Sequence, residues 1–229
     1  MNRGSGASRA VSWTVATVYD RFAMSLHSDP FFRTFHALRI KGFAKAEVVA
    51  EVADLPLSIV EAHLADLQMR EWAMYREARA LWQLTPVGRE EHKTALVADV
   101  GHLHIAQLLH DQYEIFLGVN ERFKTLCGDW QLKDGAPNDH TDREYDTAVV
   151  ERLGALNTEA VPIVEEMGGV LVRLAPYAPR LASTCQRVVG GETNMFTGVM
   201  CGSYHDVWME LHEDLILTQG IDRSAEGSF

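Results

Sequence analysis

Residues 43–86 decide the fold of this chain, and they read FAKAEVVAEVADLPLSIVEAHLADLQMREWAMYREARALWQLTP. The first part, residues 44–53, carries valines at helical spacing and predicts a short helix that ends at an ADLP turn. After the turn, Val60, Leu64 and Leu67 are spaced i, i+4 and i+7, which predicts a second helix with a single buried stripe. The segment therefore predicts two helices joined by a tight turn.

Two short aromatic-rich runs follow, at 72–75 and 80–84, and a charged tip separates them, which predicts a β-hairpin. Helix, turn, helix and hairpin is the order of a winged helix-turn-helix, a module that usually places its second helix in the DNA major groove. Residues 36–92 resemble winged-helix bacterial transcriptional regulators of the MarR-like kind. The closing LTPVGREEH, residues 84–92, is similar to the strand-to-helix exit that many of them share.

The resemblance implies which residues contact DNA. Residues of the second helix would face base edges, the wing arginines would lie near phosphates or the minor groove, and three further cations would contact the backbone. These residues are Ser58, Glu61, Ala62 and His63, then Arg76 and Arg79, then Lys41, Lys45 and Arg70. The alternative is a winged helix used for protein contacts, because the second helix is acidic and carries a single arginine. A dimer with two basic wings would partly compensate for that acidity.

Charge is distributed unevenly along the 229 residues, whose net charge is −11. Residues 1–99 contain 12 Lys and Arg against 12 Asp and Glu, whereas residues 100–229 contain 9 against 20. The second part is too acidic to bind nucleic acid, so any DNA contact is expected in the first part. No stretch approaches the ~18 consecutive apolar residues of a membrane span. Three widely spaced cysteines suit a reducing compartment, and we expect a cytoplasmic protein.

The predicted fold class is mainly α, with an N-terminal winged helix followed by an all-helical bundle. We expect a leader with a helix over 12–25 in residues 1–28, the winged helix in residues 29–99 and the helical domain in residues 100–229. FLGVNERFKTLCGDWQ, beginning at Phe116, and SYHDVWMELHEDLILTQG, beginning at Ser203, are similar to a helical domain of actinobacterial regulators. A similar segment accompanies some phosphoenolpyruvate-utilising enzymes, but their swivelling phosphohistidine segment is not found here. The resemblance implies a regulatory domain without naming its ligand.

Aromatic and polar-tipped side chains of the second part are candidates for binding a small, mostly apolar effector, because a helical bundle can enclose a pocket. Tyrosine and tryptophan combine an apolar body with a polar group that orients a ligand. The alternative is that the same residues form an ordinary bundle core. The candidates are Tyr113, Phe116, Asn120, Arg122, Phe123, Trp130, Tyr204, His205, Trp208 and His212.

Histidines raise the possibility of a metal. His102, His104 and His110 are expected on one helix, and His205 and His212 on another. Some GntR-type regulators, which also place a helical domain behind a winged helix, hold a metal with several histidines. Here the spacing permits a metal but does not require one, and scattered histidines are the simpler interpretation. We therefore assign no metal and no cofactor, and keep a metal-dependent sensor as an alternative.

Catalytic motifs are not found. The sequence has no GxSxG elbow and no phosphate-binding glycine loop, and Cys201 with His205 has no visible third group to orient it. We therefore expect a protein that is not an enzyme. The sequence predicts a ligand-responsive transcriptional regulator that binds operator DNA as a homodimer. Whether it represses or activates stays open, and so does a module that binds proteins in place of DNA.

Overall fold

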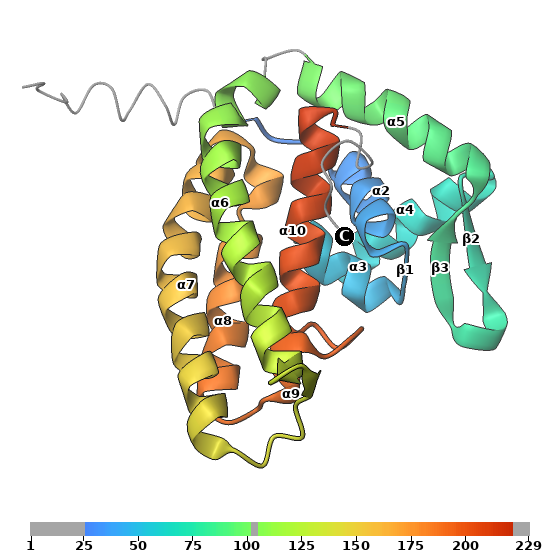
Figure 1. Ribbon diagram of the computed structural model, residues 1–229. Coiled ribbons are helices and arrows are strands. Elements are labelled where there is room, and N and C mark those ends of the chain that lie inside the picture. The colour runs from blue at the N-terminus through green and yellow to red at the C-terminus, as the bar shows by residue number, and fades with distance from the viewer. Residues whose placement is uncertain (1–25, 102–104, 222–229) are drawn as a thin grey trace, which may run out of the picture.

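The computed structural model describes residues 26–101 and 105–221, and it confirms a mainly α-helical fold with small sheets (Figure 1). The predicted helix over 12–25 and the histidines at 102 and 104 lie outside the described residues. The N-terminal part consists of α2 (Pro30–Lys41), β1 (Phe43–Ala44), α3 (Ala46–Ala53), α4 (Leu57–Met69), β2 (Ala73–Arg76), the 3-10 turn η1 (Glu77–Arg79), β3 (Leu81–Leu84) and α5 (Pro86–Gly101). The C-terminal part consists of α6 (Ile105–Gln131), β4 (Leu132–Lys133), β5 (Ala136–Pro137), α7 (Arg143–Val170), η2 (Val172–Leu174), α8 (Tyr177–Val189), α9 (Asn194–Thr197) and α10 (Tyr204–Gln219).

The predicted order of helix, turn, helix and hairpin is present in α3, α4, β2 and β3. α3 ends at Asp54, whose φ of 51° is left-handed and whose N–H closes the helix on the carbonyls of the preceding turn. The predicted stripe of α4, Val60, Leu64 and Leu67, is fully buried in one hydrophobic cluster together with Phe35 of α2. Apolar spacing alone was therefore enough to orient α4.

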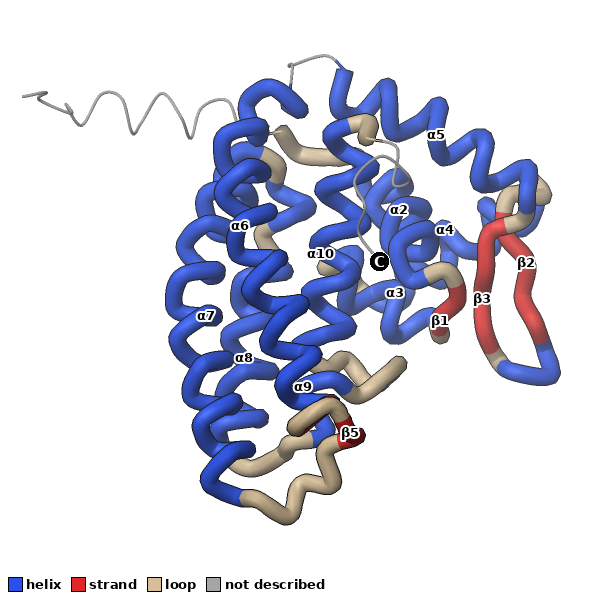
Figure 2. Tube along the Cα trace, in the orientation of Figure 1, coloured by secondary structure: helices blue, strands red, loops and turns tan. Residues whose placement is uncertain are grey.

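The hairpin is part of a three-stranded sheet in the order β1-β3-β2 (Figure 2). β2 and β3 are antiparallel, with Tyr75 opposite Trp82, so the aromatic residues form a cross-strand pair. β1 was not expected from the sequence, which predicted a helix from residue 44. Residues 43 and 44 instead pair with Gln83 and Trp82, so β1 occupies the edge of β3 that β2 leaves free.

The junction between β3 and α5 explains the TPVG part of the exit motif. The backbone N–H of Thr85 donates to the Trp72 carbonyl at 2.9 Å, and the Thr85 hydroxyl accepts from the Gly88 N–H at 2.9 Å. Thr85 therefore caps α5, and Pro86 occupies the first helical position, where no N–H is needed. A Cβ atom at position 88 would lie 1.9 Å from the Trp72 carbonyl oxygen, so only glycine allows this approach.

The C-terminal part is a bundle in which α7 packs against α6 and α8, and α10 packs against α6 and α8. The sequence left open whether α7 is bent or split, and it runs as one helix through the proline inside it. The expected polar loop after α6 contains a short hairpin, β4 and β5, so the bundle is not wholly helical. Asp134 and Gly135 both have positive φ, the conformation that an Asp-Gly turn provides between paired strands.

Helix α10 joins the two parts of the molecule. It lies between α6 and α2, in contact with both (Figure 1). Every residue of α10 is buried or half-buried. Three acidic residues of α10 contact basic residues or histidine of α2: Glu210 contacts Lys41, Glu213 contacts Arg39 and Asp214 contacts His36. Residue 26, which was expected in the leader, forms a bridge with Leu171 and so lies against the bundle.

Candidate functional site

Four of the predicted DNA-contacting residues lie on α4. Ser58, Glu61 and Ala62 are exposed on the side opposite the buried stripe, where residues three and four positions apart are neighbours. His63 is half-buried, and its Nδ1 atom lies 2.9 Å from the Thr34 hydroxyl of α2. The structure thus brings the first three to one surface and turns the fourth towards α2.

The β2–β3 hairpin carries two exposed arginines. Arg76 ends β2 and Arg79 lies at the hairpin tip, and neither has an ion-pair partner within the described ranges. Both line a hollow of about 370 Å³, together with Phe43, Ala78, Leu81 and Gln83. These guanidinium groups are therefore open to an external anion.

The other three predicted cations differ in their surroundings. Lys41 extends towards α10, where its Nζ atom lies 2.5 Å from Glu210 Oε1. Arg70 forms a bidentate pair with Asp66, with Nη2 2.9 Å from Oδ2. Lys45 is exposed and has no ion-pair partner in the part of the chain that the structure describes. Two of the three are thus already paired within the molecule.

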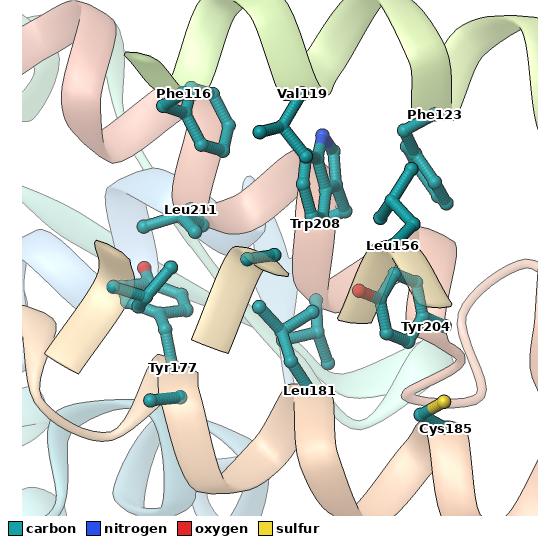
Figure 3. Packing of buried hydrophobic residues seen from close by; sticks show 14 of the residues in the cluster. Phe116, Val119, Phe123, Leu156, Tyr177, Leu181, Cys185, Tyr204, Trp208 and Leu211 are labelled. Atoms are coloured by element: carbon teal, nitrogen blue, oxygen red, sulfur yellow. The ribbon is translucent and has the colours of Figure 1, made fainter. Parts of the chain in front are cut away.

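The predicted effector-binding residues mostly lie in the bundle core. Trp208 lies among Phe116, Val119 and Phe123, with ring centroids 5.1 Å from Phe116 and 4.6 Å from Phe123 (Figure 3). Its indole N–H donates to Asn120 Oδ1 at 2.9 Å, so the polar group is satisfied inside the protein. The candidates that are buried are Tyr113, Phe116, Asn120, Phe123, Trp130, Tyr204, Trp208 and His212. The six of them with Phe, Tyr or Trp side chains belong to the hydrophobic core cluster of the bundle.

Two candidates lie outside that core. Arg122 is exposed and pairs with Glu159 at 2.6 Å, and His205 is half-buried at the start of α10, where burial lowers the pKa of its imidazole. Within the core, the hydroxyls of Tyr113 and Tyr204 are buried and have no hydrogen-bond partner among the described residues. The structure therefore does not bring all ten candidates to one surface.

A buried ionic cluster that the sequence did not indicate lies between α2, α5, η2 and α10. Asp214 accepts from the guanidinium of Arg173, and its Oδ1 atom lies 3.1 Å from His36 Nε2. His36 Nδ1 lies 2.9 Å from His92 Nε2, and Arg173 Nε lies 3.5 Å from Asp99 Oδ2. All five side chains have less than a tenth of their surface exposed. The cluster connects the N-terminal part to the bundle.

The protonation of this cluster follows from burial and from neighbouring charges. Burial by itself would raise the pKa of the Asp214 carboxyl, but the guanidinium charge of Arg173 and the hydrogen bonds from Arg173 and His36 outweigh it and hold the pKa below its ordinary value. Burial lowers the pKa of both imidazoles, that of His92 to about 2, with His36 adding to the effect. The cluster is therefore a guanidinium–carboxylate pair beside two neutral histidines.

Beside this cluster an open cleft of about 600 Å³ lies between α10 and the N-terminal part of the molecule. Two ion pairs cross the boundary at its wall: Glu210 accepts from Lys41 at 2.5 Å, and Arg39 lies 3.1 Å from Glu213. Glu210 also accepts from Arg180 of α8, within the bundle, at 2.7 Å. The cleft is lined by Arg39, Ile40, Lys41, Gly42, Phe43, Ala44, Lys45, Val48, Leu81, Met200, Asp206, Met209, Glu210 and Glu213. A ligand in the cleft would contact both parts of the molecule.

The sequence held only a weak signal for these residues. Glu210, Asp214 and Thr218 are spaced four apart on α10, which is also the pattern of an ordinary solvent-facing helix side. Their partners, His36 and Arg173, lie far away in the chain. Periodicity cannot distinguish a polar face that meets water from one that meets another polar face.

Two general properties concern the described residues as a whole. Within residues 26–101 and 105–221, no group of three or more His, Cys, Asp and Glu side chains is placed to hold a metal ion. None of the helices in these ranges is both long enough and apolar enough to cross a membrane.

Comparison of the chain with protein-family models, with curated proteins and with solved structures gave no match.

Proposed function

We propose that this chain is a DNA-binding transcriptional regulator that responds to a small molecule. The observation that supports this most is the surface formed by α4 and the wing. The outer side of α4 is exposed, and Arg76 and Arg79 are exposed on the hairpin that follows it, with no ion-pair partner among the described residues. An exposed helix face and unpaired guanidinium groups in one module suit a duplex, since cations hold phosphates while a helix enters the major groove.

In this proposal α4 is the reading helix. Val60, Leu64 and Leu67 hold it against the core, so Ser58 and Glu61 point outwards. The wing arginines would contact phosphates or the minor groove of the adjacent turn. Because one protomer offers few free cations, strong binding would need two copies, and a homodimer on a two-fold operator would provide them.

Helix α10 would transmit the signal of the effector. It is packed against both α2 and the bundle, so a ligand that moves α10 would change the orientation of the winged helix. In a dimer, such a movement would change the spacing of the two reading helices. The expected site of action is the cytoplasm, where operator DNA is accessible.

The test is binding of the purified protein to a fluorescent duplex that carries its own upstream region. We expect affinity at low salt that falls steeply as salt rises, because phosphate contacts release counterions. Replacing Arg76 and Arg79 with glutamine should lower the salt slope by about one unit per lost phosphate contact. Arg143→Gln is the matched control, since Arg143 is exposed at the start of α7 in the bundle. No binding at low salt would end the proposal.

A second candidate function is a module that binds another protein. It is favoured by apolar side chains on α4, because Leu57 is 38%, Ile59 43% and Met69 77% exposed. Such residues next to Glu61 fit a protein partner better than a phosphate backbone. An α4 variant with Leu57→Ser and Ile59→Ser separates the two functions. It should abolish partner binding, while phosphate-driven DNA binding should keep its salt slope.

A further inference from the structure

The cleft between α10 and the winged helix has the size and the position of a ligand site. Its volume of about 600 Å³ lies within the range of small-molecule pockets, roughly 300–1,000 Å³. One wall is the end of α2 with β1, α3 and β3, and the other is α10 with the loop that precedes it. A molecule bound here touches the DNA-facing module and the bundle together.

The cleft offers an apolar surface that is mostly aliphatic. Val48 and Leu81 line one wall, Met200 and Met209 line the other, and Phe43 contributes the aromatic ring. Met200 and Phe43 are largely open, at 66% and 44% exposed. Methionine adapts to irregular shapes, so this surface suits a flexible hydrocarbon chain better than a rigid ring system.

The acidic groups of the cleft are already engaged inside the protein. Glu210 is shared by Lys41 and Arg180, and Glu213 lies beside Arg39. The Asp206 carboxylate accepts from two backbone N–H groups of the preceding loop, at 2.9 Å and 3.0 Å. These carboxylates are therefore poor partners for a cationic ligand.

One cationic side chain of the cleft is not engaged by a carboxylate of the described residues. Lys41 and Arg39 are held by Glu210 and Glu213, whereas Lys45 is exposed and has no ion-pair partner among the described residues. Lys45 lies at the start of α3, two positions after Phe43, and both residues line the cleft. The charge that remains for a ligand is positive.

We propose that this cleft binds a medium-chain aliphatic carboxylate, whose chain covers the apolar walls and whose carboxylate pairs with Lys45. The regulatory consequence rests on the proposed function, because Lys45 is also a predicted phosphate contact. The carboxylate of the bound ligand neutralises the charge of Lys45, and its aliphatic chain occupies the space between α10 and the winged helix. Binding of the ligand therefore weakens binding of DNA.

The test is calorimetric titration of the full chain, without DNA, using decanoate, decanol and decylammonium. We expect decanoate to bind about fivefold more tightly than decanol, as for one solvent-accessible ion pair, and decylammonium to bind most weakly. Lys45→Gln should remove the preference for decanoate over decanol, and Lys45→Arg should keep it. Because Lys45 is exposed, neither variant should disturb folding. Arg143→Gln again serves as the control.

A second variant tests the location. Met209→Trp narrows the cleft from α10 and should weaken decanoate and decanol alike. Equal affinity for the three probes, or an unchanged preference in Lys45→Gln, would overturn the proposal. Since these titrations contain no DNA, a negative result in them would not contradict the proposed binding of DNA. If the protein bound decanoate as expected but did not bind DNA, the carboxylate site would remain supported and only its regulatory role would be rejected.

Discussion

The Nε2 atom of His36 on α2 lies 3.1 Å from the Oδ1 atom of Asp214 on α10, and both side chains are buried. The described residues form two separate hydrophobic clusters, one in the N-terminal part and one in the bundle. Charged and polar groups therefore contribute to the joint between them. The stability of this interface requires that every buried charged group keeps its partner, because burying a charge without its partner is strongly unfavourable.

Asp214→Asn should lower the free energy of unfolding by about 3–5 kcal/mol, because it leaves the guanidinium of Arg173 buried without its closest carboxylate. Urea unfolding followed by circular dichroism measures the change. Glu159→Gln is the control, since it breaks an ion pair with Arg122 on the surface and should cause no measurable loss. Equal effects of the two substitutions would mean that the cluster does not hold the parts together.

Stability should fall as the pH drops below about 6.5. Burial keeps His36 and His92 neutral in the folded protein by lowering the pKa of both, that of His92 to about 2, whereas the unfolded imidazoles have their ordinary pKa of 6.5. Between these values the unfolded chain binds more protons, so acid favours unfolding. The depressed pKa of Asp214 adds a further loss below the ordinary carboxyl range. Urea midpoints measured from about pH 7.5 to about pH 5 report the slope.

The same measurement on His92→Gln separates this cause from general acid sensitivity. That variant should show a shallower fall between about pH 6.5 and about pH 5, because one group that takes up protons on unfolding is gone. Arg143→Gln, at an exposed position of α7, should keep the slope of the parent protein. A slope that His92→Gln leaves unchanged would contradict the assignment.

Gly88→Ala should destabilise the protein by several kcal/mol or prevent folding, because the new Cβ atom would lie 1.9 Å from the Trp72 carbonyl oxygen. Gly118→Ala provides the opposite case. Gly118 lies in the middle of α6 with no atom near its added Cβ, so alanine should stabilise the helix by about 0.5–1 kcal/mol. Thermal unfolding of both variants measures whether each substitution raises or lowers stability. A Gly88→Ala variant as stable as the parent protein would contradict the close approach of position 88 to the Trp72 carbonyl.

Asn120→Ala should cost about 1–3 kcal/mol, because it leaves the indole N–H of Trp208 buried without an acceptor. Trp208→Phe, made in the Asn120→Ala variant, removes the indole N–H that has lost its acceptor. The two substitutions should therefore be less than additive in urea unfolding, which a double-mutant cycle measures. Full additivity would show that the hydrogen bond does not couple them.

The sequence determined the local elements of this protein. The stripe Val60, Leu64 and Leu67 placed α4, the aromatic runs placed the hairpin, and the exit motif placed the start of α5. These features follow from backbone propensity and from apolar spacing within a few residues. The same local information could not show that β1 would pair with Trp82, because that pairing joins distant segments.

Only the tertiary structure decided which polar and aromatic residues meet. Trp208 and Phe116 have the composition of a ligand pocket, yet they pack on each other, because whether facing helices leave a space depends on their distance. Glu210 and Asp214 have the spacing of a solvent-facing surface, yet α2 and η2 cover them. Periodicity reports that a helix has two faces, but what each face touches is set by the long-range packing of the whole chain.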